Sequence, residues 1–225
     1  MTPPRHDAAF AAAMEDVLAV YARPPDPAWP LVCLDEVPIT LHADRYPAHP
    51  ARPGRPARRD YAYVRGGSAT VFLAVAPQRG WRLAQVTAHR TAIDFAHVVR
   101  AVLDGPAAAA DGIVLVTDNL NTHTPAAFYH AFPAPEARRL LARIEWHYTP
   151  KHGSWLNMAE IELSVLTRQC LDRRLGDVAT LDGELAAWVA ARNAAATPID
   201  WRFTLELARI RLAHVYPEVN HANLA

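Results

Sequence analysis

The run IVLVT, from Ile113 to Thr117, constrains the fold most strongly, because a continuous aliphatic stretch of this length is typical of a strand covered on both faces. Such strands lie inside sheets that carry helices on either side. The run ends directly at Asp118, and a shorter apolar run, Leu31 to Leu34, ends in the same way at Asp35. Ligands of open α/β sheets gather at the carboxyl ends of strands, so we expect both aspartates at one site.

The rest of the chain alternates strand and helix patterns. Segments rich in β-formers at 69–76 and 81–87 indicate a hairpin, and Thr91 with Asp94 has the capping-box pattern at the start of a helix over 91–103. Further helices are predicted over 7–21, over 125–144 with a proline interruption, over 154–171 with Ser154 as N-cap and over 181–195, and a short strand over 145–148. This order predicts an α/β fold with a mixed central sheet and helices on both faces.

Composition indicates a globular protein inside the cell. Hydrophobic residues make up 51% and charged residues 20% of the chain, which argues against extended disorder. The N-terminus lacks a signal-peptide pattern, no stretch is apolar enough to span a membrane, and two cysteines cannot form a disulfide framework. We therefore expect a cytoplasmic protein without a membrane partner.

Positive charge is concentrated in one segment, although the formal net charge of the chain is +0. Over 52–65 the sequence has five arginines and the single acid Asp60, so the local charge is 5 − 1 = +4. The segment is rich in proline and expected to be exposed, which makes it a candidate for contacts with DNA phosphates. A solvated loop without a partner is the alternative. The candidate residues are Arg52, Arg55, Arg58, Arg59 and Arg65.

A third carboxylate completes a candidate metal site. Mg²⁺ prefers oxygen ligands, and carboxylates that converge in a cleft repel one another unless a cation neutralises them. Glu160 and Glu162 both lie on the helix predicted over 154–171. Projected at about 100° per residue, Glu160 lies at the boundary between the apolar stripe and the polar surface, whereas Glu162 lies beside Met158 and Val165. The projection favours Glu160 as the ligand and leaves Glu162 open as a supporting residue or a surface charge.

Three blocks resemble the catalytic motifs of bacterial insertion-sequence transposases related to the mariner superfamily. The blocks are CLDE at Cys33 to Glu36, DNLNTH at Asp118 to His123, and HYTPKHGSWLNMAEIE at His147 to Glu162. Weaker similarity covers RPGRPARRDYAYVRGG and the segment from Asn193 to Thr204. The blocks follow the order of that family, and each has a carboxylate at the family position.

The resemblance implies a ribonuclease-H-like fold with a DDE site. In that site Asp35, Asp118 and Glu160 hold two Mg²⁺ ions, for which Mn²⁺ is a substitute. The implied reaction is phosphodiester cleavage at transposon ends followed by strand transfer into target DNA. The implied partners are double-stranded DNA, at the nucleoid, and a second copy of the chain when assembled on DNA.

Polar residues beside the motifs are further candidates for DNA contact. Asn119, Asn121 and His123 follow the second aspartate, where they orient metal-bound water or contact DNA, and a network that only stabilises the loop is the alternative. Lys151 and His152 precede the glutamate helix, where they either neutralise a phosphate or form a plain surface turn.

The sequence predicts three parts: a helix and proline-rich linker over 1–29, a catalytic domain over 30–196, and a helical tail packed on that domain over 197–225. Transposases of the resembled family carry N-terminal helix-turn-helix modules, and the segment before Asp35 is too short for one. Two hypotheses follow: an active nuclease and strand-transferase module, or a non-catalytic fragment that binds DNA or a partner transposase and regulates it.

Overall fold

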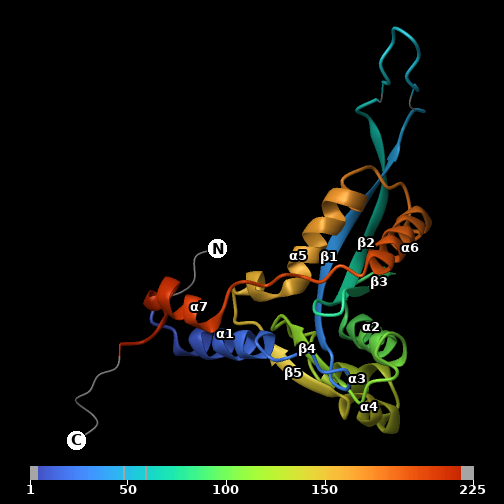
Figure 1. The fold of residues 1–225 in the computed structure, drawn as a ribbon. Helices are drawn as coiled ribbons and strands as arrows, with labels where there is room; N and C mark the ends of the chain where they lie inside the picture. The colour runs from blue at the N-terminus through green and yellow to red at the C-terminus, as the bar shows by residue number, and fades with distance from the viewer. Residues whose placement is uncertain (1–4, 48, 59, 219–225) are drawn as a thin grey trace, which may run out of the picture.

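The central sheet has five strands in the order β3-β2-β1-β4-β5 (Figure 1). A computed structural model describes residues 5–47, 49–58 and 60–218. The antiparallel strands β1, β2 and β3 form a meander, and β4 and β5 extend the sheet in parallel with β1. The mixed sheet is therefore confirmed, and β4 is the buried inner strand predicted from its aliphatic run. The strands are β1 (Leu31–Asp44), β2 (Tyr63–Ala76), β3 (Trp81–Thr87), β4 (Ile113–Thr117) and β5 (Ile144–Tyr148).

Helices cover both faces of the sheet because side chains of each strand alternate between two apolar clusters. In β1, Val32 and Leu34 pack against α2, α3 and α4, whereas Leu31 and Cys33 pack on the side of α1, α5 and α7. A third cluster joins α5 and α6 to β2. The helices are α1 (Ala8–Tyr21), α2 (Ala92–Asp104), α3 (Ala126–Ala131), α4 (Ala134–Leu141), α5 (Met158–Leu166), α6 (Val178–Ala195) and α7 (Leu205–Arg211).

The first strand differs from its prediction. Instead of ending at Asp35, β1 continues to Asp44, because it pairs with the antiparallel β2 from Cys33 onward. Only the parallel pairing with β4 stops near the aspartate, with Cys33 opposite Val116 as its last pair. Asp35 thus lies inside a strand, at the point where the neighbouring parallel strand ends.

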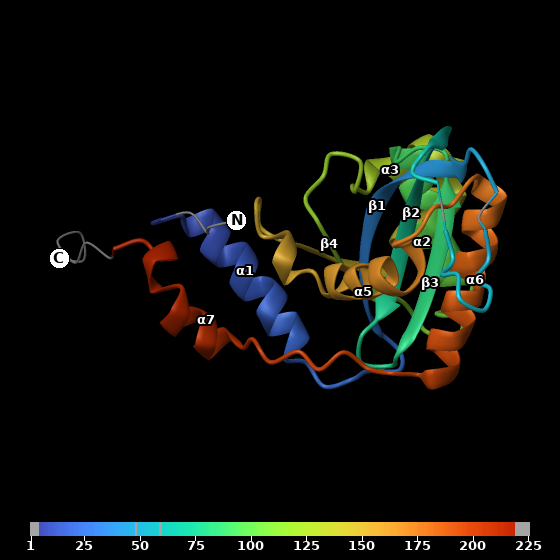
Figure 2. The same cartoon turned by 90° about the horizontal axis from the view of Figure 1, so that it is seen from above.

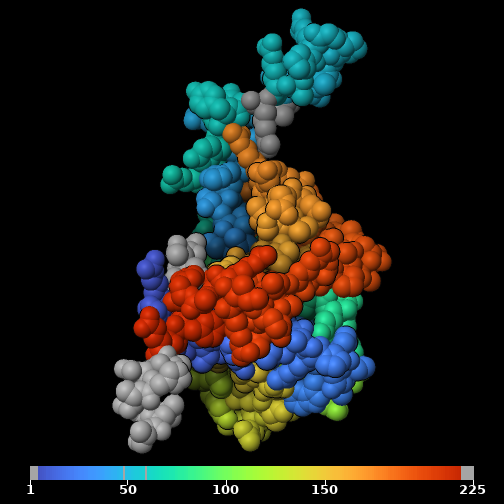
Figure 3. All heavy atoms as spheres, turned by 60° about the vertical axis from the view of Figure 1, so that its left-hand side comes forward, coloured from blue at the N-terminus to red at the C-terminus, as the bar shows by residue number. Residues whose placement is uncertain are grey.

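The segment predicted as an exposed arginine loop forms the tip of the hairpin between β1 and β2. The hairpin projects from the body of the molecule as an arm (Figures 1 and 3). Arg65 is part of β2, and a tight turn joins Arg52 and Arg55 through two backbone hydrogen bonds of 2.9 and 2.8 Å. Gly54, inside this turn, has a φ of +73°, which a residue without a Cβ adopts at low cost.

The predicted helix over 154–171 is divided into three pieces. A 3-10 turn spans Ser154–Leu156, α5 follows, and a π-helical turn covers Thr167–Leu171. Ser154 is therefore not the N-cap of the main helix. Asn157 has that role, since its side chain accepts a hydrogen bond from the backbone N–H of Ala159 at 3.1 Å.

The two ends of the described chain pack together beside the sheet (Figure 2). Ala208 of α7 and Val215 are buried in the same apolar cluster as Phe10 and Met14 of α1. The backbone N–H of Asp7 also donates to the carbonyl of Val215 at 2.8 Å. Across residues 5–47, 49–58 and 60–218, no helix has the length and hydropathy needed to cross a membrane.

Candidate active site

The register of the parallel strands brings the two aspartates together. Leu31 stands opposite Val114 and Cys33 opposite Val116, an offset of 83 residues in each case (114 − 31 and 116 − 33). The same offset places Asp35 level with Asp118, since 35 + 83 = 118. The predicted meeting of these two residues at one edge of the parallel strands is therefore built into the sheet.

Asp35 is a buried carboxylate, 8% exposed, and no basic side chain within the described part of the chain pairs with it. One carboxylate oxygen accepts the backbone N–H of Glu36 at 2.9 Å, and the other lies 3.5 Å from the amide nitrogen of Asn157. Burial, together with the negative charges of Glu36, Asp118 and Glu160, raises the pKa of Asp35 to about 7. The carboxylates on β1, after β4 and on α5 are thus close enough to interact electrostatically.

Asp118 is held by a histidine five residues later in the chain. Its Oδ1 lies 2.5 Å from Nδ1 of His123, whose Nε2 is 3.4 Å from Oε2 of Glu36. The imidazole stacks on Phe95 with ring centroids 4.4 Å apart, and Thr117 Oγ1 lies 3.2 Å from Nδ1. Burial lowers the pKa of His123, but the two carboxylates outweigh it and raise that pKa to about 9. A cationic imidazole therefore bridges two carboxylates at neutral pH.

His123 is only 1% exposed, so its ring is not on a surface that DNA can reach in this structure. The contacts of His123 with Asp118 and Glu36 fit the alternative interpretation of the sequence, in which this residue belongs to a network that stabilises the loop. Glu36, whose side chain is 3% exposed, is a member of this network that the sequence prediction missed. A signal for it was present, because Asp35 and Glu36 are consecutive in a strand and must point to opposite faces.

The structure separates the two candidates for the third carboxylate. Glu160 is exposed in the first turn of α5 and contributes to the electrostatics of Asp35. Glu162 is 1% exposed and receives two hydrogen bonds from Arg82, at 2.9 and 3.0 Å, and two from Arg192, at 2.8 and 3.2 Å. Its oxygens are occupied by arginines inside the protein. Glu160 therefore remains the candidate ligand, and Glu162 has a structural role.

The carboxyl groups of Asp35, Asp118 and Glu160 lie too far apart in this structure to bind one metal ion together. Among the residues that the structure describes, no group of three acidic, histidine or cysteine side chains is close enough to hold a metal ion. The expected convergence at coordination distance is not met here, because like charges repel and Asp118 is turned toward His123. The donor set nevertheless fits a hard divalent cation, since it consists of oxygen atoms and its buried member, Asp35, has no positive partner in the part of the chain that the structure describes.

The remaining candidates for DNA contact are exposed but lie in two separate places. Asn119 and Asn121 follow β4, and Lys151 and His152 form the turn after β5, where His152 has a φ of +65°. The arginines lie instead on the hairpin arm, away from β4 and β5 (Figure 1). Arg52, Arg55, Arg58 and Arg65 are exposed there, and Arg59 lies outside the described residues.

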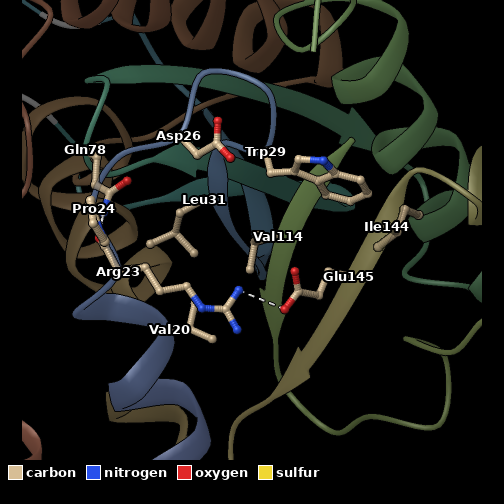
Figure 4. Close-up of a pocket in the computed structure, with 10 residues that line it drawn as sticks. All are labelled: Val20, Arg23, Pro24, Asp26, Trp29, Leu31, Gln78, Val114, Ile144 and Glu145. Carbon is tan, nitrogen blue, oxygen red and sulfur yellow. Dashed lines mark hydrogen bonds and ion pairs between the residues drawn. The ribbon is translucent and has the colours of Figure 1, made fainter. Parts of the chain in front are cut away.

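A pocket occurs at the opposite ends of the parallel strands (Figure 4). Leu31 of β1 and Val114 of β4 line it, and an ion pair of 2.8 Å between Arg23 and Glu145 crosses it. Leu31 is the first residue of β1 and Val114 the second residue of β4, whereas the aspartates follow the last parallel pair. The pocket is therefore separate from the carboxylate site.

The family follows from comparison of the sequence. The model of the DDE superfamily endonuclease family matches residues 30–182, which is 182 − 30 + 1 = 153 of the 225 residues. The chain belongs to this family. The matched segment includes Asp35, Asp118 and Glu160. No curated protein gives a significant match to the sequence.

Solved structures of Mos1 mariner transposase complexes have the same fold. The mariner Mos1 paired end complex with Mg aligns with a TM-score of 0.57 and 15% identity, over 97% of this chain and 66% of that one. The paired end complex with Mn aligns with a TM-score of 0.54 and 16% identity, over 85% of this chain and 58% of that one. The Mos1 Strand Transfer Complex aligns with a TM-score of 0.53 and 16% identity, over 81% of this chain and 53% of that one. The fold is therefore ribonuclease-H-like, as predicted, and the chain spans less than two thirds of the length of these proteins.

Proposed function

We propose that the chain is the catalytic part of a DNA transposase, which cleaves phosphodiester bonds at transposon ends and transfers the strands into target DNA. The observation that carries the proposal is the buried Asp35, for which the described residues supply no cationic partner and which lies near Asp118 and Glu160. Membership of the DDE endonuclease family and the shared fold with complexes described as paired-end and strand-transfer complexes support it. In this proposal the catalytic domain covers residues 30–196, and the described residues of the flanking segments 1–29 and 197–225 pack beside it.

In this proposal Asp35, Asp118 and Glu160 hold two Mg²⁺ ions, with Mn²⁺ as a substitute. The bound ions supply the charge that stabilises the attacking and leaving oxygens of an in-line displacement. The protein contributes position: β1 and β4 fix two carboxylates through the register of the sheet, and α5 presents the third. The similar Mos1 mariner paired end complexes with Mg and with Mn support this ion choice.

Double-stranded DNA is the proposed partner, contacted by the exposed arginines of the hairpin arm and by the polar turns that carry Asn119, Asn121, Lys151 and His152. Phosphate contacts position a protein on DNA without reading its sequence. A second copy of the chain joins when the assembly forms on DNA, at the nucleoid. The non-catalytic regulator remains as an outcome of the test below.

The proposal is tested by incubating the chain with duplex DNA that carries the end of its own element, with Mg²⁺, with Mn²⁺ and with a chelator. We expect metal-dependent nicking that the Asp118→Asn and Glu160→Gln variants lose. Asp182→Asn is the matched control, because Asp182 is exposed on α6 and the substitution makes the same change in charge. DNA binding without metal-dependent cleavage would support the regulator instead.

A further inference from the structure

Asn157 connects the strand of the first catalytic aspartate to the helix of the candidate glutamate. Its side chain is 0% exposed. The amide oxygen accepts the N–H of Ala159 at 3.1 Å, and the amide nitrogen donates to the carbonyl of Leu34 at 2.9 Å. The same nitrogen lies 3.5 Å from a carboxylate oxygen of Asp35. One buried side chain therefore contacts β1 at Asp35 and the first turn of α5.

The position of Glu160 depends on this connection. Glu160 is three residues after Asn157, and its backbone N–H donates to the carbonyl of Asn157 at 3.0 Å. Ser, Thr and Asp also cap helices, but Asp has no donor when ionised, and a hydroxyl has its donor and acceptor on one atom close to its own backbone. The amide of Asn carries them on two separate atoms, which here reach the helix and the strand. The choice of Asn at this position is explained by the bridge and not by the cap alone.

Tyr21 of α1 fixes the turn on both sides of Asn157. Its hydroxyl donates to the carbonyl of Leu156 at 2.8 Å and lies 3.4 Å from the backbone N–H of Met158, which donates to it. The ring packs edge-on against Trp201, with centroids 5.2 Å apart. Tyr21 precedes the residues 30–182 that match the family model, so a segment outside that match contacts the backbone next to the site.

We propose that Asn157 is a positioning residue that sets the placement of Glu160 relative to Asp35, and that Tyr21 holds it there. This inference rests on the proposed function, because it concerns the same carboxylates. Two hydrogen-bonded anchors, one on β1 and one on α1, restrict how α5 can slide along the sheet. Loss of either anchor lets the helix shift and separates carboxylates that must bind the same ions.

The main test compares Asn157→Ser with Asp177→Ala. Serine retains a cap oxygen but is too short to bridge to β1, whereas Asp177→Ala removes the N-cap of α6, a bond of 2.7 Å to the N–H of Thr180, without touching the site. Mn²⁺ binding is followed by electron paramagnetic resonance and cleavage by gel assay. We expect Asn157→Ser to weaken Mn²⁺ binding and to slow cleavage, each at least tenfold. Asp177→Ala should lower the melting temperature by about 2–4 °C and leave Mn²⁺ affinity unchanged.

Tyr21→Phe is the second variant and keeps the test decisive if Asn157→Ser does not fold. It retains the ring that packs on Trp201 and removes only the hydroxyl, so we expect Mn²⁺ binding to weaken severalfold. Wild-type Mn²⁺ affinity in either folded variant, combined with loss of binding in Asp118→Asn, overturns the positioning role alone. A wild-type chain that binds no Mn²⁺ overturns the proposed function, and this inference with it.

Discussion

The buried ion-pair network of Glu162 gives the sharpest test of how the two neighbouring glutamates divide their roles. Arg82, which is 2% exposed, donates two hydrogen bonds to Glu162 and one to the carbonyl of Thr197 at 2.9 Å. Arg192 of α6 donates to the same carboxylate. The perturbation is Glu162→Gln, which removes the negative charge and leaves one guanidinium buried without its partner.

The cost of this change follows from burial. Removing one partner of a buried ion pair costs about 3–5 kcal/mol, because the remaining charge stays desolvated and unpaired. For a chain of this size, each kcal/mol corresponds to about 2–4 °C, so the melting temperature should fall by about 6–20 °C. Glu160→Gln changes an exposed side chain and should alter stability by less than about 0.5 kcal/mol.

The pH dependence gives a second readout of the same network. Burial raises the pKa of Glu162, but hydrogen bonds to Arg82 and Arg192 outweigh it and hold that pKa below its ordinary value of 4.5. The carboxylate therefore contributes stability above pH 4.5, and this contribution is lost as the pH falls through the pKa of the folded state. The difference in melting temperature between wild type and Glu162→Gln should therefore become smaller at acidic pH.

The assay is a set of thermal melts of wild type, Glu160→Gln and Glu162→Gln without metal, from pH 3 to pH 8 in about six steps, together with Mn²⁺ binding at neutral pH. The expected pattern is a stable Glu160→Gln that loses Mn²⁺ binding and a destabilised Glu162→Gln that binds Mn²⁺ when folded. A Glu162→Gln protein that melts like wild type and fails to bind Mn²⁺ would refute the assignment of the two glutamates.

Three further predictions concern charge. The pKa of Asp35 is raised from an ordinary 3.8 to about 7, so the folding stability of the metal-free protein should fall by up to about 4 kcal/mol as pH rises from 3.8 to 7. Thermal melts of Asp35→Asn should not show this fall. The pKa of His123 is raised from an ordinary 6.5 to about 9, so the charged imidazole should stabilise the fold fully below pH 6.5, and this stabilisation should be lost as pH rises to 9. In urea unfolding, the free energy of unfolding of His123→Gln should depend less on pH over this range. DNA binding should weaken steeply with salt, and Arg55→Ala with Arg58→Ala should reduce the slope of log K against log salt by about 2 in an anisotropy titration. A preference for the true transposon end above about tenfold, or 1.4 kcal/mol, would contradict phosphate-dominated binding.

Local patterns were sufficient for the inner part of the sheet. The aliphatic run Ile113 to Thr117 predicted a buried strand because all of its side chains are suited to burial, a pattern that is complete within the run. Thr91 with Asp94 likewise predicted the capping box of α2 from residues close together in the chain. The extension of β1 beyond Asp35 was missed, since the segment EVPIT contains a proline and mixes polar with apolar residues. It is a strand because β2 pairs with it residue by residue, which depends on the partner strand.

The site could be predicted as far as residue types and spacing reach. Helical projection placed Glu160 at the edge of the apolar stripe, but it could not reveal that Glu162 is occupied by Arg82, which is 80 residues away in the chain. The inward position of His123 was equally hidden, because it depends on the stacking of its ring on Phe95 of α2. Contacts of this kind are set by packing between elements and leave no periodic signal.

The dipeptide Asp35-Glu36 explains how one strand serves two sides of the site. Because neighbouring strand residues face opposite ways, Asp35 points toward α5 and Glu36 toward His123. On the second face a cationic imidazole neutralises Glu36 and holds Asp118 by a charge-assisted hydrogen bond. On the first face the described residues supply no cationic side chain that pairs with Asp35, and its pKa is raised to about 7. His123 thus orients Asp118, but its positive charge does not reach Asp35 or Glu160. In the proposed function, a divalent cation supplies the positive charge for these two carboxylates.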